Sequence, residues 1–223
     1  MKRAGAYSAG LFSKTATALV LLHLFSVTAF AQSRRAAFQH LSKAEKRWVF
    51  FHPFAAKKAQ RISLHARAVA DSLVKAGRLE GPNGGAADAF RHAYWMASLV
   101  QEISPRKARK LGEAHEKGNY EQFKKGKLED EAQPDSAGSV MDLLNNDWGI
   151  RFGEEHRISR TNMITEIIIA LGEGNLKVMR RDTKGHYLDR DGKHIDMELW
   201  KGKWNVPKKL VPSGHAPEPC SGK

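Results

Sequence analysis

The chain has 223 residues and a strongly basic composition, with 37 Lys and Arg residues against 24 Asp and Glu residues. Its single Cys excludes an intramolecular disulfide framework, so apolar burial must stabilise the fold, and a chain of this length has enough residues to build such a core. The excess of cations favours anionic partners such as lipid headgroups. The cations are spread along the chain, which favours a solvated basic surface over nucleic-acid recognition.

Residues 1–31 have the features of a cleavable secretory signal peptide. Lys2, Arg3 and Lys14 precede an apolar stretch that is shorter than the ~20 residues a membrane-spanning helix needs. Ala29-Phe30-Ala31 forms a small-x-small cleavage site, so we expect cleavage after residue 31. The expectation is an exported protein, periplasmic or secreted, with no transmembrane segment in the mature chain; an uncleaved N-terminal anchor is the alternative.

The first predicted helix begins at a capping box. Ser42 precedes Glu45 by three residues, which is the spacing at which side chain and backbone satisfy each other's hydrogen bonds. We expect Trp48, Val49 and Phe51 to form the apolar side of this helix, and Pro53 to end or kink it.

Further helices are predicted from apolar residues spaced by three or four. Pro105 suits the first turn of a helix, and the Ile-rich stretch near residue 168 favours a helix over a strand because of its length. The predicted helices span residues 54–76, 86–103, 105–117, 138–151 and 160–171.

The composition changes after Gly172. The Asp191-Gly192 pair lies between two short mixed segments and predicts a β-hairpin. The sequence therefore predicts a mainly α protein, a multi-helix bundle with a small C-terminal β-hairpin. Its expected parts are a signal peptide (1–31), a helical domain (32–172), a hairpin extension of that domain (173–205) and an irregular Pro-rich tail (206–223).

Three of the predicted helices carry a polar cluster within apolar surroundings. Asp88 and His92 are four residues apart and share a helix face, with Trp95 about one turn further along. An Asp near a helix N-terminus is favourable for the helix dipole, and it can fix the tautomer of a neighbouring His.

The other two clusters are His115-Glu116 and the segment from Asp142 to Gly149. Adjacent helical residues diverge by about 100°, so His115 and Glu116 cannot both point at one centre. In the third cluster Asp142, one of the two following Asn residues and Gly149 align over two turns, and the glycine could admit another helix backbone at close range.

If these helices pack together, two imidazoles and two carboxylates converge. Such a set suits Zn²⁺ or another divalent cation with an open position that activates water, and Glu116 is then a candidate general base. The expected metal ligands are Asp88, His92, His115 and Asp142; the expected catalytic residues are His92, His115, Glu116 and Asp142; the expected substrate-binding residues are Arg91, Trp95, Asn145 and Asn146. The predicted activity is metal-assisted hydrolysis of an anionic ester, such as a phospholipid or another phosphoester.

A second interpretation stays open. The same polar side chains could form a satisfied buried network that fixes the register of the helices, because buried polar groups are usually paired without being catalytic. The protein would then be a non-catalytic binding or effector module. The spacing of the candidate ligands matches no established metal signature such as HExxH.

The ordered segments DAFRHAYWMASL, AHE and MDLLNNDWG resemble an uncharacterised bacterial domain family, found in secreted proteins and near the ends of large toxin-like surface proteins. The resemblance covers roughly residues 80 to 155. It implies no particular reaction. Leu144 stands where the family often has a polar residue, sometimes His. The resemblance thus implies that one ligand or hydrogen-bonding group is missing from this chain.

Overall fold

The computed structural model describes residues 38–128 and 132–215. The predicted signal peptide lies outside the described residues, as does the end of the tail from residue 216. The chain divides into two units, Met1–Leu41 and Ser42–Lys223, and the second unit carries every element named below.

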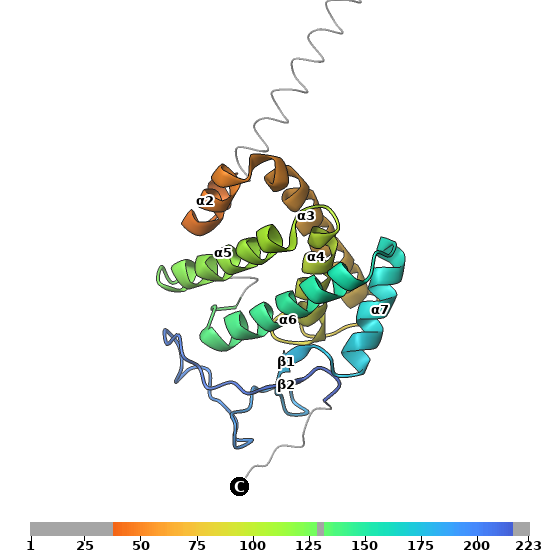
Figure 1. Ribbon diagram of the computed structural model, residues 1–223. Coiled ribbons are helices and arrows are strands. Elements are labelled where there is room, and N and C mark those ends of the chain that lie inside the picture. The colour runs from red at the N-terminus through yellow and green to blue at the C-terminus, as the bar shows by residue number, and fades with distance from the viewer. Residues whose placement is uncertain (1–37, 129–131, 216–223) are drawn as a thin grey trace, which may run out of the picture. The chain divides into compact units, whose positions relative to one another are not determined.

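The second unit is mainly α-helical, with one small antiparallel sheet near its C-terminal end, as the sequence predicts (Figure 1). Among the described helices, none combines the length and the apolar character that crossing a membrane requires. The elements are α2 (Lys43–Phe51), α3 (Pro53–Lys75), α4 (Ala86–Val100), α5 (Pro105–Phe123), α6 (Ser136–Glu155), α7 (Arg160–Gly172), β1 (Lys177–Met179) and β2 (Leu210–Pro212).

Helix α2 begins at the predicted capping box. The Glu45 backbone N–H donates to Ser42 Oγ at 3.1 Å, and the Ser42 N–H donates to Glu45 Oε2 at 2.8 Å. Trp48 is buried and donates from its indole N–H to the Lys107 carbonyl at 3.1 Å, which ties α2 to α5. Phe51, however, is 63% exposed, so the prediction that it belongs to the apolar side of this helix is wrong. The helix ends at Phe51 and α3 begins at Pro53, so Phe51 lies at the turn between the two helices, where its ring faces solvent.

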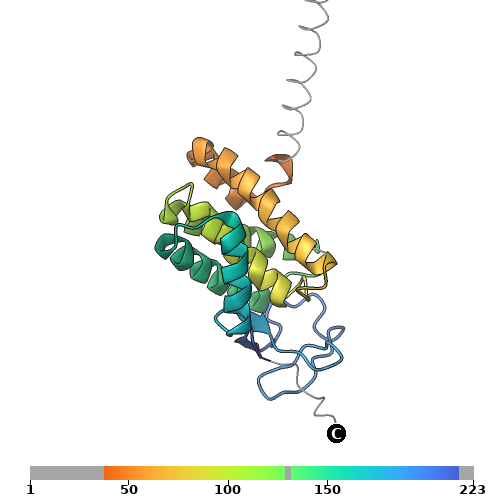
Figure 2. The ribbon, with the colours of Figure 1, turned by 90° about the vertical axis from the view of Figure 1, so that its right-hand side faces the viewer.

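Helix α4 is the centre of the core. It contacts α3, α5, α6 and α7, and Phe90, Tyr94 and Leu99 have no exposed surface. A helix that is apolar nearly all round is stable only when neighbours enclose it. Figure 2 shows α3 and α7 beside this helix.

Two glycines let α6 approach the backbone of α4. A Cβ at Gly149 would lie 2.3 Å from the Ala93 carbonyl oxygen, and one at Gly153 would lie 2.3 Å from a Val100 methyl group. Real side chains do not tolerate such distances, so only glycine permits this contact. The close approach brings the polar residues of α6 within reach of those on α4.

Several helices differ in length from the prediction. Helix α4 stops at Val100 rather than at residue 103, while α5 continues to Phe123, past the predicted end at residue 117. Gly118 does not break α5 because it has a packing role: a Cβ there would lie 2.7 Å from Ser42 Oγ. Helix α6 starts two residues early because Asp135 caps it, accepting from the Gly138 N–H at 2.9 Å.

The small sheet pairs Val178 with Val211, in antiparallel register. β2 therefore comes from the segment 206–223, which the sequence predicts to be irregular. The turn predicted at Asp191-Gly192 does reverse the chain, with an isolated bridge between Leu188 and His194. A strand of three residues has too little pattern to stand out in the sequence, because its position is set by the partner strand.

Candidate metal centre

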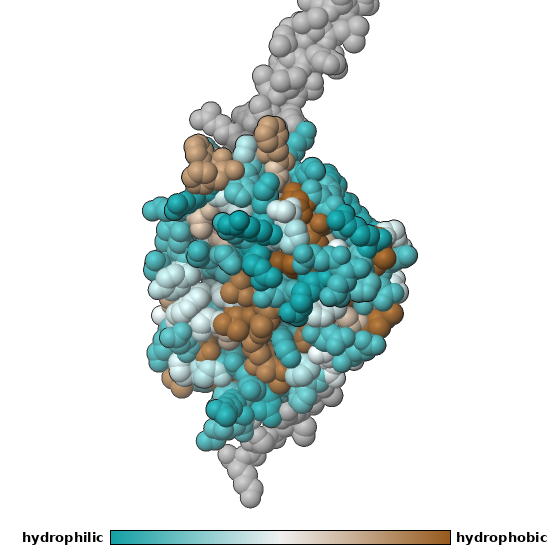
Figure 3. Space-filling view, viewed as in Figure 1, coloured by the Kyte–Doolittle hydropathy of each residue, from teal (hydrophilic) through white to brown (hydrophobic). Residues whose placement is uncertain are grey.

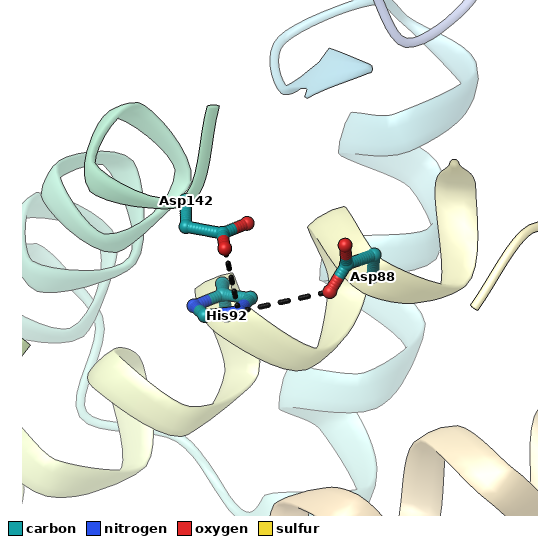
Figure 4. Close-up of side chains that lie close together, drawn as sticks. All are labelled: Asp88, His92 and Asp142. Atoms are coloured by element: carbon teal, nitrogen blue, oxygen red, sulfur yellow. Dashed lines mark ion pairs between the residues drawn. The ribbon is translucent and has the colours of Figure 1, made fainter. Parts of the chain in front are cut away.

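Helices α4 and α6 bring Asp88, His92 and Asp142 together (Figure 4). His92 Nε2 lies 3.6 Å from Asp88 Oδ1 and 3.4 Å from Asp142 Oδ2. One ligand atom from each of the three residues can be chosen so that all lie within 4.8 Å of one another, and all three residues are buried. The i, i+4 spacing on α4 places Asp88 and His92 on one face, and the glycine contact with α6 adds Asp142.

The His92 ring is fully buried, and its two nitrogens have different surroundings. Nδ1 lies 3.2 Å from Asn146 Oδ1, which only accepts hydrogen bonds, so this nitrogen carries the ring proton of a neutral imidazole. Nε2 has no hydrogen-bond partner among the described residues. Burial lowers the pKa of His92 well below its ordinary value, and the positive charges of Arg91 and His115 lower it further. The ring is therefore neutral, and its Nε2 lone pair faces two carboxylates.

Asp88 is held in place from two other directions. Arg91 donates to its Oδ1 at 2.5 Å, and the Gly84 backbone N–H donates to its Oδ2 at 2.8 Å. Asp88 lies in the first turn of α4, where the helix dipole favours a negative charge. These contacts fix the orientation of the carboxylate toward His92.

The two carboxylates line a cavity of about 60 Å³. That volume accommodates a cation with several water molecules. Arg91, Asp135, Tyr187 and Lys208 are also part of its wall. Lys208 forms an ion pair with Asp135 at 2.5 Å and lies 4.0 Å from the centre of the Tyr187 ring. No sequence pattern marks Tyr187 or Lys208 as a site residue, and the only signal for Asp135 is its N-cap position before α6.

Two predicted site residues on α5 lie outside this cluster. His115 Nδ1 pairs with Glu45 Oε1 of α2 at 3.1 Å, and its ring centre is 6.2 Å from that of His92. Glu116 is buried and accepts from the Asn119 amide at 3.2 Å. Neither residue belongs to the described wall of the cavity. Trp95 makes edge contacts with both His rings, at 6.2 Å and 5.6 Å.

The two adjacent Asn residues of α6 have separate partners. Asn146 contacts His92, whereas Asn145 bonds in both directions to the backbone of Lys177 in β1, at 2.9 Å and 2.8 Å. The Asn145 amide thus anchors the sheet to α6. Leu144, where the resemblance implies a missing polar group, is 44% exposed and is not part of the described cavity wall.

These features define a mainly helical protein with a buried Asp-His-Asp cluster beside a small polar cavity. Residues 46–175 match the family described as "Domain of unknown function (DUF6973)". The match covers more than half of the chain, from within α2 to two residues before β1, and the chain belongs to this family. Comparison with curated proteins finds no match, and neither does comparison with solved structures.

Proposed function

We propose that Asp88, His92 and Asp142 bind a divalent cation such as Zn²⁺, and that the protein is a metal-assisted hydrolase of an anionic ester, most simply a phosphoester. The observation that carries the proposal is the convergence of three buried acceptor atoms within 4.8 Å. A nitrogen lone pair and carboxylate oxygens repel one another in a buried site, and an unsatisfied buried acceptor costs about 1–3 kcal/mol. A cation removes this cost because it binds all three.

The chemistry of the donor set supports the choice of metal. Imidazole nitrogen and carboxylate oxygen are both ligands of Zn²⁺, and a catalytic zinc site uses three protein ligands and leaves one position for water. A metal-binding His also commonly donates its other ring N–H to an oxygen acceptor, which fixes the tautomer. Asn146 Oδ1 supplies that acceptor for His92.

The charge of the cavity supports an anionic substrate. Asp88, Asp135 and Asp142 outnumber Arg91 and Lys208 by one negative charge. A divalent cation reverses this balance to one positive charge. An anionic ester is then attracted to the metal, with Arg91 and Lys208 as the side chains that contact its oxygens.

Asp88, His92 and Asp142 would hold the cation. A divalent ion bound there would supply a Lewis acid and would lower the pKa of a coordinated water, which is the chemistry that hydrolysis of a phosphoester needs. Glu116 and His115 are given no role in the reaction, because neither belongs to the cluster of Asp88, His92 and Asp142.

One observation favours the second candidate, a non-catalytic module with a structural polar core. Asp88 is already paired with Arg91 and with the Gly84 N–H, as a carboxylate in a satisfied network would be. This candidate gives no role to the Nε2 atom of His92, which faces the two carboxylates without a hydrogen bond. The two candidates differ in whether the protein needs a metal.

A hydrolysis assay on a chromogenic phosphodiester tests the proposal. The protein is stripped with a chelator and then supplied with Zn²⁺ or Mn²⁺; we expect turnover only with metal, and its loss in Asp142→Asn. Asp147→Asn is the matched control, because Asp147 lies on the same helix but is about half exposed and pairs with Arg109. Metal-independent turnover, absence of turnover with every metal, or an active Asp142→Asn variant would contradict the proposal.

We also propose that the protein is exported and loses residues 1–31. The features that support it are the basic start of the chain, the short apolar stretch and the Ala29-Phe30-Ala31 site. N-terminal sequencing of the secreted or periplasmic protein should give Gln32 as its first residue. An intact Met1 in the exported fraction would contradict cleavage.

A further inference from the structure

The corner between α2 and α3 exposes three large aromatic side chains. Phe50, Phe51 and Phe54 are 77%, 63% and 92% exposed. Phe50 and Phe51 contact each other edge to face, with ring centres 5.3 Å apart. Figure 3 shows hydrophobic surface at the end of the molecule where α2 meets α3 in Figure 1. Exposed apolar clusters of this kind commonly mark an interaction surface.

The corner is held firmly, so the exposure of its rings is built into the fold. The capping box fixes the start of α2, and the Trp48 indole ties its last turns to α5. His52 stacks on Trp48 with ring centres 5.1 Å apart, and Pro53 opens α3 directly afterwards. The inward position of Trp48 leaves the neighbouring Phe side chains facing outward.

The chain segment that forms this corner carries charged side chains of positive sign only. Residues 46–70 contain no Asp or Glu. They contain six cations: Lys46, Arg47, Lys57, Lys58, Arg61 and Arg67. Arg61 pairs with Glu102 and Lys58 donates to the Glu102 carbonyl, whereas Arg47 and Lys57 are exposed on the same segment as the three Phe residues. The Arg47 guanidinium lies 5.9 Å from the centre of the Phe51 ring.

We infer that the corner of Phe50, Phe51 and Phe54 docks the protein on an anionic lipid surface. Apolar rings enter the boundary between headgroups and acyl chains, while Lys and Arg side chains contact the negative headgroups. Both components are present within one short segment of this chain. A protein partner would need a complementary acidic patch around an apolar pocket, whereas a membrane supplies both over its whole surface. The inference stands independently of the proposed metal site.

Vesicle binding by the purified protein tests this inference. We expect binding to phosphatidylglycerol vesicles and little binding to phosphatidylcholine vesicles. Replacing all three Phe residues with Ser should weaken binding by about tenfold or more. Leu199→Ser is the control, because Leu199 is 69% exposed and belongs to the C-terminal segment, far from the corner in the sequence. Arg47→Glu with Lys57→Glu should also weaken binding, unlike the control pair Lys184→Glu with Lys193→Glu.

A fluorophore placed at the corner gives a readout specific to that site. Cys220 is the only Cys, so Phe54→Cys in a Cys220→Ser background carries one label. Its emission should shift to shorter wavelength on anionic vesicles, whereas a label on Leu199→Cys should not. Equal binding by the triple Ser variant, or an unshifted label at position 54, would overturn the inference. So would a parent protein that self-associates through the corner and ignores vesicles, since a second copy would then be the partner.

Discussion

The α4–α6 contact and the α2–α3 corner depart from the usual arrangement of polar and apolar groups in opposite directions. The contact buries two carboxylates beside an imidazole nitrogen that has no hydrogen-bond partner among the described residues, whereas the corner leaves three Phe side chains largely exposed to solvent. Each is an unfavourable arrangement for the isolated chain. The difference between them indicates the missing component: a cation in the first case and an apolar, anionic surface in the second.

The contact also depends on tight backbone packing, and the corner does not. The polar cluster exists only because glycines let α6 lie against α4, so changes there should affect stability and site together. The Phe residues of the corner can change with little effect on the fold.

The largest expected effect is that of Gly149→Ala. A Cβ there would lie 2.3 Å from the Ala93 carbonyl oxygen, so α6 must move away from α4. We expect a loss of about 3 kcal/mol in the free energy of unfolding, measured by urea denaturation, because overpacking against backbone cannot relax by a side-chain rotation. Gly172→Ala is the control, since nothing lies within 4 Å of a Cβ there. Equal stability of the two variants would show that the helices are not held this closely.

Asn145→Ala should cost about 2 kcal/mol, because it leaves the N–H and carbonyl groups of Lys177 without their partners. The loss should appear as faster hydrogen exchange in β1 and β2. Asn162→Ala is a suitable control on the exposed surface of α7. Unchanged exchange in the sheet would contradict the anchoring role of Asn145.

Asp142→Asn should have opposite effects on the metal-free and metal-bound protein. Without metal, an amide N–H in place of a carboxylate oxygen can donate to His92 Nε2, so the free energy of unfolding should rise by about 1 kcal/mol. With Zn²⁺ the parent should gain stability and the variant should not. A metal-free Asp142→Asn variant that is clearly less stable than the parent would favour a structural polar core.

The smallest effect concerns Glu45 and acid stability. Burial raises the pKa of Glu45, but the hydrogen bond and positive charge of His115 outweigh it, so the pKa lies below its ordinary value. A carboxylate with a lowered folded-state pKa contributes stability above its unfolded pKa of about 4.3, and this contribution is lost as the pH falls. The parent should therefore lose stability more steeply below about pH 5 than Glu45→Gln.

Glu45→Gln should not disturb the start of α2, because Gln at this position can still complete the capping box. Circular dichroism should therefore show the same helix content for both proteins at pH 7. Identical acid-denaturation curves would contradict the lowered pKa of Glu45 in the folded protein.

The sequence predicts α3 to α7 well, because apolar residues recur at helical spacing over long segments. It predicts Phe51 wrongly, since the periodicity of α2 does not reveal that the helix ends there and turns. Strand β2 has too few residues for a recognisable pattern. The pairing of His115 with Glu45, seventy positions apart, depends on how α2 packs on α5, which no local pattern contains.

Part of the polar cluster can be predicted from the spacing of its residues along the sequence. Asp88 and His92 share a face by helical geometry, and Gly149 indicates a close helix contact that brings Asp142 within reach. Tyr187 and Lys208 could not be foreseen, because they reach the cavity from irregular segments. The chain path there is set by the sheet and by the Asp135–Lys208 pair.

The most direct test of the metal centre is the Zn²⁺ content of the purified protein after dialysis against the metal, measured by elemental analysis. We expect one ion per chain in the parent and in Asp147→Asn, and loss of that ion in His92→Ala and Asp142→Asn. Absence of stoichiometric Zn²⁺, Mn²⁺ or another divalent ion from the parent, or its retention in both cluster variants, would contradict the assignment of Asp88, His92 and Asp142 as a metal site.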